Sequence, residues 1–147
     1  MKYDKFLIVV SIGAVSTIPG EILSRVLIYF GIGKYSIYEL ASLLITFNRP
    51  TIILGLIVDF TVSGVVATLL YLVLGKIGSK YLVIKTLGGS LLAWFVTELL
   101  FTSTIEGKYI PIRPISDYYC HIFGAVAFGV TLGVLFKRFI FKKLASI

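Results

Sequence analysis

Four long runs of apolar residues dominate the chain, and short polar or glycine- and proline-containing segments separate them. The runs cover residues 6–30, 51–74, 81–101 and 118–136. A helix needs about 20 apolar residues to cross the hydrocarbon core of a bilayer, and each run provides that length. The pattern predicts an all-α integral membrane protein, a four-helix bundle that forms a single domain over residues 1–147.

A fifth apolar segment, residues 35–47, contains 13 residues and ends before Asn48-Arg49-Pro50. It is too short to cross a bilayer but apolar enough to contact lipid. We expect a short interfacial or re-entrant helix here, or else an extension of a neighbouring span. In the first run, Pro19-Gly20 predicts a kink or a break, because proline removes a helical hydrogen bond.

Composition supports the membrane assignment. Hydrophobic residues make up 58% of the chain and charged residues 14%, whereas soluble domains average about 45–50% and 25%. The net charge of +7 does not indicate nucleic-acid binding, because the basic residues flank the apolar runs and form no patch interleaved with aromatic residues.

The basic residues also predict orientation. Eight lie at one set of span ends and four at the opposite ends, namely Lys2, Lys5, Lys76, Lys80, Lys137, Arg138, Lys142 and Lys143 against Lys34, Arg49, Lys108 and Arg113. The positive-inside rule then places both termini in the cytoplasm and the protein in the cytoplasmic membrane of the cell. A cleavable signal peptide ending near residues 14–16 is the alternative, which we disfavour because apolar sequence resumes at Ile22.

Ionisable residues interrupt every span. Glu21, Arg25, Asp59, Glu98 and His121 all fall in the expected outer half, while Lys85 lies near the inner face. Charges at this depth are costly unless they are paired or hydrated, so they mark candidate ligand- or ion-binding residues. In each span they share a stripe with mostly small residues at intervals of four, and such stripes let membrane helices approach closely.

We therefore expect one outward-facing polar cluster with Arg25 at its centre. The structural alternative is that Glu21 and Arg25 only pair at i,i+4, that Glu98 is solvated at the interface, and that His121 is a satisfied histidine at a helix start. Asp59 is harder to explain by structure alone, because no basic residue lies three or four positions from it.

The sequence gives little support to conventional catalysis. One cysteine and one histidine exclude an intrachain disulfide and metal sites built from several of these residues, and nucleotide, zinc-protease and serine-hydrolase motifs are missing. We assign no catalytic residue, no metal and no cofactor. Trp94 is interpreted as a packing or interfacial aromatic residue.

Several short motifs follow one another from Asn48 onward. They are Asn48-Arg49-Pro50 before a span with Gly55 and Asp59, then Lys85-Thr86-Leu87-Gly88 and Trp94 in the next span, then His121-Ile122-Phe123-Gly124 with Gly129 in the last. Over residues 48–136 the chain resembles a loose group of uncharacterised small four-span bacterial membrane proteins. The resemblance implies a four-span bundle and no established activity.

Three hypotheses for function follow. The leading one is a non-catalytic membrane component, either an accessory or structural subunit or a module that binds a small solute or lipid at the polar cluster. The second is a proton- or cation-coupled transporter that uses Asp59 and Glu21, and the third is an interfacial lipid-modifying enzyme. Membrane lipid is the expected partner. Self-association or attachment to a larger membrane complex is also plausible, with the Gly129/Gly133 face as a candidate seam if it is not used inside the chain.

Overall fold

The computed structural model describes residues 4–142 as five α-helices followed by a short π-helical turn. The elements are α1 Lys5–Tyr29, α2 Ile37–Thr46, α3 Ile52–Ile77, α4 Leu82–Thr104, α5 Ile115–Leu135 and η1 Phe136–Ile140. Helices α1, α3, α4 and α5 with its continuation η1 are long and apolar enough to cross a membrane. The expected all-α, four-helix architecture is confirmed, and the described residues contain no strand.

The sequence explains where the helices begin and end. The Asp4 carboxylate accepts a hydrogen bond of 2.9 Å from the Phe6 N–H and so caps α1. Ser36 and Glu39 form a reciprocal capping box at the start of α2. Gly78, with φ +81°, ends α3. Helix α1 continues through Pro19, so the expected break at Pro19-Gly20 does not form.

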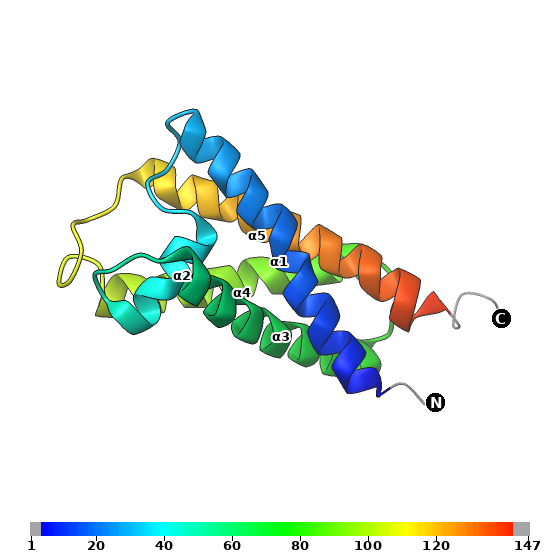
Figure 1. Cartoon of the computed structure of the whole chain (residues 1–147). Coiled ribbons are helices and arrows are strands. Elements are labelled where there is room, and N and C mark those ends of the chain that lie inside the picture. The colour runs from blue at the N-terminus through cyan, green and yellow to red at the C-terminus, as the bar shows by residue number, and fades with distance from the viewer. Residues whose placement is uncertain (1–3, 143–147) are drawn as a thin grey trace.

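The two ends of the bundle differ. Helix α2 and the segment 105–114 lie at one end, which we call the α2 end, and the beginning of α1, the end of α5 and the connection 78–81 lie at the other (Figure 1). Six of the eight basic residues used to predict orientation lie at this other end, and Lys2 and Lys143 fall outside the described residues. Sidedness relative to the cytoplasm stays a prediction.

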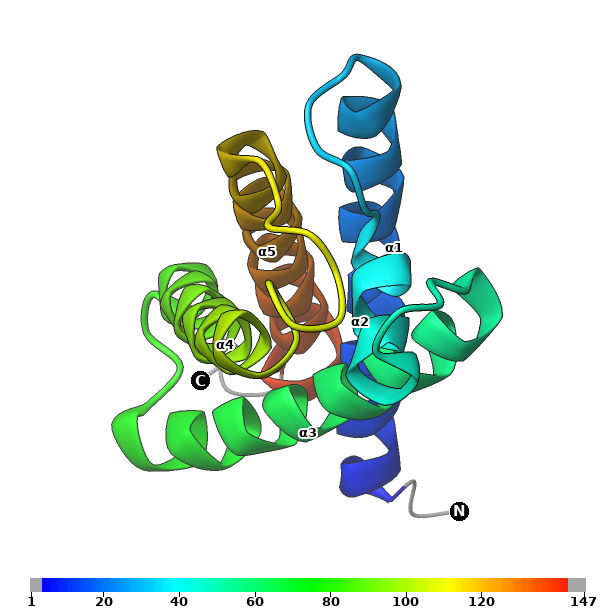
Figure 2. The same ribbon diagram turned by 90° about the vertical axis from the view of Figure 1, so that its left-hand side faces the viewer.

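Helix α2 is set into its end of the bundle (Figure 2). The Ile37 N–H lies 3.4 Å from the Ser24 hydroxyl oxygen of α1, and Ser24 is five residues, or about 8 Å, inside the end of that helix. A Cβ atom at Gly55 would overlap the Tyr38 backbone, so α2 packs closely on α3 only because residue 55 is glycine. These contacts hold α2 against α1 and α3, and its position relative to the membrane surface stays a prediction.

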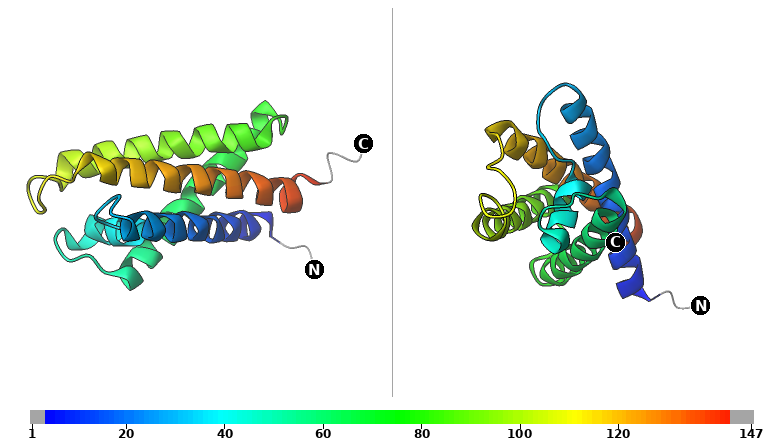
Figure 3. Two further views of the ribbon diagram at one scale, coloured as in Figure 1. Left: turned by 90° about the horizontal axis from the view of Figure 1, so that it is seen from above. Right: turned by 60° about the vertical axis from the view of Figure 1, so that its left-hand side comes forward.

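The long helices pack side by side in the order α3, α1, α5, α4. Helix α1 contacts both α3 and α5 extensively, and α4 packs on α5, but α3 and α4 share few contacts. Helix α3 crosses the other helices diagonally (Figure 3). It meets α4 near their short connection, where a Cβ atom at Gly89 would overlap the Leu70 side chain.

Small residues mediate the closest approaches between helices. Gly13 of α1 faces Ser63 and Ala67 of α3, while Gly129 and Gly133 of α5 face α4. The Gly129/Gly133 face expected as a possible seam between copies is therefore used inside the chain. Side chains add hydrogen bonds there, since the Ser90 hydroxyl donates to the Ala125 carbonyl oxygen at 2.9 Å.

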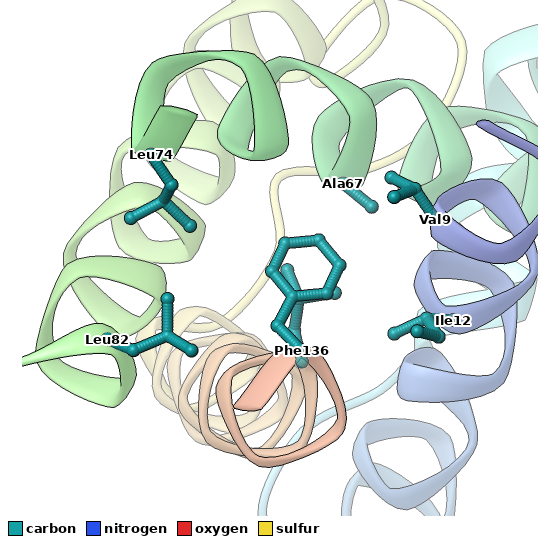
Figure 4. Packing of buried hydrophobic residues seen from close by; sticks show 7 residues of the cluster. Val9, Ile12, Ala67, Leu74, Leu82 and Phe136 are labelled. Atoms are coloured by element: carbon teal, nitrogen blue, oxygen red, sulfur yellow. The ribbon is translucent and has the colours of Figure 1, made fainter. Parts of the chain in front are cut away.

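Two hydrophobic cores lie at opposite ends. The larger core lies at the end with the termini and consists of Val9, Ile12, Ala67, Leu74, Leu82, Leu132 and Phe136, most of which Figure 4 labels. The smaller core lies under the α2 end and consists of Leu43, Phe101, Ile105 and Ile110. Nearly all buried charges lie toward the α2 end of the molecule.

Candidate functional site

Arg113 is the centre of the largest polar group in the protein. Its side chain is 0% exposed, and its guanidinium binds three carboxylates: Glu98 at 2.6 Å, Asp117 at 3.0 Å and Glu106 at 3.2 Å. The guanidinium also stacks against the Phe101 and Tyr118 rings, 4.7 and 4.6 Å from their centroids. We call Arg113, Glu98, Glu106, Asp117, Tyr118 and His121 the Arg113 cluster.

Local sequence explains how a loop arginine becomes buried. Pro111 and Pro114 flank Arg113 closely and restrict its backbone. Asp117 lies in the first turn of α5, four residues after Arg113, where a carboxylate is favoured by the helix dipole. The loop therefore folds inward over the ends of α4 and α5 and does not extend away from them.

Glu106 fixes the same loop from its other side. Its carboxylate accepts bonds from the Arg113 N–H at 2.7 Å and from the Tyr118 hydroxyl at 2.8 Å. Burial alone would raise the pKa of Glu106, but these hydrogen bonds and the Arg113 charge outweigh it, so the pKa is lowered. Burial alone would lower the pKa of Arg113. The hydrogen bond and negative charge of Glu98, together with the charges of Glu106 and Asp117, outweigh burial and raise that pKa.

His121 and Asp117 connect the Arg113 cluster to the segment before α2. The His121 Nε2 atom lies 2.9 Å from the Tyr35 carbonyl oxygen, and Nδ1 lies 3.5 Å from both Arg113 Nη1 and Glu98 Oε1. Asp117 Oδ1 accepts bonds from the Lys34 and Tyr35 N–H groups at 2.7 and 3.1 Å. Both nitrogens of the His121 ring are thus engaged within the protein.

A second polar group attaches α2 to α1. Arg25 Nε donates to Glu21 Oε1 at 2.6 Å, and Glu21 Oε2 accepts a bond of 3.0 Å from the Tyr38 N–H. The Tyr38 and Thr17 hydroxyl oxygens lie 3.2 Å apart. Burial raises the pKa of Tyr38, so the hydroxyl remains protonated and able to donate. We call Thr17, Glu21, Arg25 and Tyr38 the Glu21 cluster.

A cavity of about 160 Å³ lies between these two clusters. Its walls are mostly apolar and come from α2, α3, α4 and α5, with Thr17 from α1. The apolar lining residues include Leu40, Leu44, Val58, Val62, Val66 and Phe128. Val62 of α3 and Thr97 of α4 line the cavity and are exposed on the surface of the bundle. The cavity therefore opens sideways between α3 and α4, at the depth of the membrane-spanning segments.

Two polar atoms in the cavity wall are buried without a hydrogen-bond partner. They are Asp59 Oδ2 on α3 and Trp94 Nε1 on α4. Asp59 lies seven residues from the beginning of α3 and Trp94 ten residues from the end of α4, so at 1.5 Å per residue they lie about 10 and 15 Å from the α2 end. An unsatisfied buried polar group costs about 1–3 kcal/mol, so atoms of this kind call for an explanation.

The structure distributes the five predicted site residues over these three features. Glu98 and His121 were expected to surround Arg25. Both instead contact Arg113 and belong to the Arg113 cluster. Glu98 is 7% exposed and paired, so it is not merely solvated at an interface. Glu21 and Arg25 form their expected pair, and the Arg25 side chain is 44% exposed. Only Asp59 lies in the cavity with an oxygen that has no partner.

Sequence reasoning missed Arg113, Glu106 and Asp117 as members of a buried site. Arg113 was counted only as a basic flank, and Glu106 and Asp117 were given no role. The available signal was the segment Pro111-Ile112-Arg113-Pro114-Ile115, in which one charge lies between apolar and rigid residues. Nothing in the sequence beyond the residue type indicated that the Trp94 Nε1 atom would be buried without a hydrogen-bond partner.

The carboxylates of the Arg113 cluster are not arranged to hold a metal. The guanidinium occupies the position between them, and among residues 4–142 no group of three or more His, Cys, Asp or Glu side chains has the arrangement of a metal site. Comparison of the chain with known protein families, curated proteins and solved structures found no match.

Proposed function

We propose that this integral membrane protein is a non-catalytic binding module that takes an amphiphilic molecule, a lipid or a lipid-like solute, into the cavity between α3 and α4. The observation that carries the proposal is the pair of unpaired polar atoms, Asp59 Oδ2 and Trp94 Nε1, in the wall of an otherwise apolar cavity. A ligand with a polar head and an apolar chain satisfies both kinds of surface.

The size and chemistry of the cavity support this function. Binding sites for small molecules are typically concave and apolar, with a few polar groups that fix orientation. The cavity volume of about 160 Å³ is about ten times the roughly 10–15 Å³ that one water requires by the same kind of measure. The lateral opening at Val62 and Thr97 faces the lipid side of the bundle, so a ligand reaches the cavity from the membrane.

The two polar clusters hold the cavity in shape. The Arg113 cluster fixes the ends of α4 and α5, and the Glu21 cluster fixes α2 against α1. Their charged groups are paired with one another, which leaves Asp59 as the carboxyl group for a ligand. Because both nitrogens of His121 contact protein atoms, we favour binding over catalysis.

Brominated lipids test the proposal, because Trp94 is the only tryptophan in the chain and its emission reports on the cavity. The protein is reconstituted in vesicles that contain increasing fractions of a phospholipid with brominated acyl chains. We expect quenching of Trp94 that saturates at a low fraction of brominated lipid, which indicates a site and not random contact.

Matched variants distinguish the cavity from the lipid-facing surface. Val66→Phe fills the cavity and should abolish the saturable phase, whereas Val65→Phe on the exposed side of the same helix should retain it. A fluorophore moved to the lipid-facing position by Trp94→Phe with Phe95→Trp should be quenched in proportion to the bulk lipid. Equal quenching curves for Val66→Phe and Val65→Phe would contradict the proposal.

A second candidate function is proton- or cation-coupled transport. The observation that favours it is the position of Asp59, a membrane-embedded carboxyl with no basic partner, beside the Glu21 cluster. Proteoliposomes with an internal pH dye test this function: transport requires flux that Asp59→Asn abolishes, whereas a binding module shows none above that of empty vesicles.

A further inference from the structure

The charges around the cavity are unbalanced. Two carboxyl groups, Asp59 and Glu98, line it. The two flanking clusters add three more carboxyl groups, Glu21, Glu106 and Asp117, but only two guanidinium groups, Arg25 and Arg113. Each guanidinium is already engaged: Arg25 by Glu21 and Arg113 by three carboxylates. Among the described residues, no lysine or arginine lines the cavity, and His121, the one histidine in its wall, has both ring nitrogens against protein atoms.

This imbalance discriminates between ligand charges. An anionic head group entering the cavity would meet Asp59 and Glu98 with no cation to pair with, and like charges in a low-dielectric site repel strongly. A cationic head group would supply the missing partner for Asp59. A neutral head group would gain only an ordinary hydrogen bond, which is weaker than a charge-assisted one.

The second unpaired atom specifies more of the head group. Indole Nε1 only donates, so Trp94 requires an acceptor atom on the ligand, while the Asp59 carboxylate requires a donor. The two residues lie in the wall of one cavity, Asp59 on α3 and Trp94 on α4. A head group that carries both an amine and an oxygen can therefore meet both requirements.

We propose that the ligand is a cationic amphiphile: a protonated amine with a neighbouring hydroxyl or carbonyl oxygen, carried on an apolar chain that leaves the cavity between α3 and α4. The amine donates to Asp59 Oδ2, and the oxygen accepts from Trp94 Nε1. This inference rests on the proposed binding function and adds the charge and polarity of the head group.

The test compares three probes that share one alkyl chain. N-dodecylethanolamine carries an amine and a hydroxyl, dodecanol only a hydroxyl, and dodecanoate a negative charge. Each is titrated into the full chain in a nonionic detergent, at a pH where the amine is protonated, and Trp94 emission is recorded. The variant with the fluorophore at position 95 corrects for partitioning into the micelle.

We expect half-saturation by N-dodecylethanolamine at a concentration about tenfold or more below that for dodecanol, because hydrogen bonds to charged groups are the stronger kind. Dodecanoate should bind least. Asp59→Asn should remove the advantage of the amine, whereas Asp4→Asn, which removes an exposed carboxylate at the other end of α1, should preserve it. Asp59→Glu keeps the charge and should retain part of the preference if Asp59→Asn fails to fold.

The outcomes separate the two proposals. If dodecanol or dodecanoate saturates Trp94 as readily as the amine, or if Asp59→Asn keeps the amine preference, the cavity binds amphiphiles but the cationic head group is wrong. If no probe produces a saturable change at Trp94 while the position-95 control reports only partitioning, the binding function itself is overturned.

Discussion

Arg113 Nη2 lies 2.6 Å from Glu98 Oε2, and this ion pair joins a loop residue to the interior of a spanning helix. The two side chains are 0% and 8% exposed. The pair closes the α2 end over the cavity, since Glu98 is also one of the residues that line it.

Arg113→Met should strongly destabilise the protein. The substitution leaves Glu98, Glu106 and Asp117 buried without their common cation, and removing one partner of a buried ion pair costs about 3–5 kcal/mol. Thermal unfolding followed by circular dichroism in detergent measures the effect. Lys108→Met, at an exposed position of the same loop, is the control. Equal melting temperatures for the two variants would mean that the buried ion pair contributes nothing.

Glu106 should make stability depend on pH in the acidic range. Its pKa is lowered in the folded protein from the usual value of 4.5, so its contribution is complete above that value and is lost as the pH falls through the folded pKa. Melting temperatures measured from pH 6 downward should fall less steeply for Glu106→Gln than for the unmodified protein. A Glu106→Gln profile parallel to that of the unmodified protein would refute this role.

Gly129→Ala should destabilise the bundle by about 1–3 kcal/mol, because overpacking a close contact forces helices apart. A Cβ atom there would overlap the Ser90 hydroxyl oxygen of α4. Gly88→Ala is the matched control, since a Cβ atom at that position meets open space and alanine favours helix. The comparison uses melting temperatures in one detergent. If Gly88→Ala lowered the melting temperature more than Gly129→Ala, α4 would make its close contact through the face of Gly88 and not through that of Ser90.

Cysteine labelling tests the predicted sidedness. Cys120 is 0% exposed and makes a poor reporter, so single cysteines are introduced in a Cys120→Ala background. A membrane-impermeant maleimide should label Tyr109→Cys, at the α2 end, in intact cells, and Ser79→Cys, between α3 and α4, only after lysis. The reverse pattern would invert the orientation.

The sequence predicted the spans well because apolar periodicity and length are local properties. Residues such as Asp4, Ser36 and Gly78 mark helix ends through local hydrogen bonds and backbone geometry, which short segments of sequence determine. The pairing of Glu21 with Arg25 was predictable for the same reason, since i,i+4 neighbours share a helix face.

The partners of Glu98 and His121 were not predictable from local spacing. Arg113 reaches them because a loop folds inward, and 15 residues separate Arg113 from Glu98 along the chain. The break considered at Pro19 was a second wrong expectation, because α1 continues through this residue. The cavity depends on the divergence of α3 from α4, a tertiary feature that hydropathy does not encode.

Structure determination in a lipid bilayer or nanodisc would show directly what occupies the cavity. We expect non-protein density there, with a polar end in contact with Asp59 Oδ2 and Trp94 Nε1 and a chain that leaves between Val62 and Thr97. A cavity closed by its own side chains, with Asp59 paired to a basic residue of the protein, would contradict it.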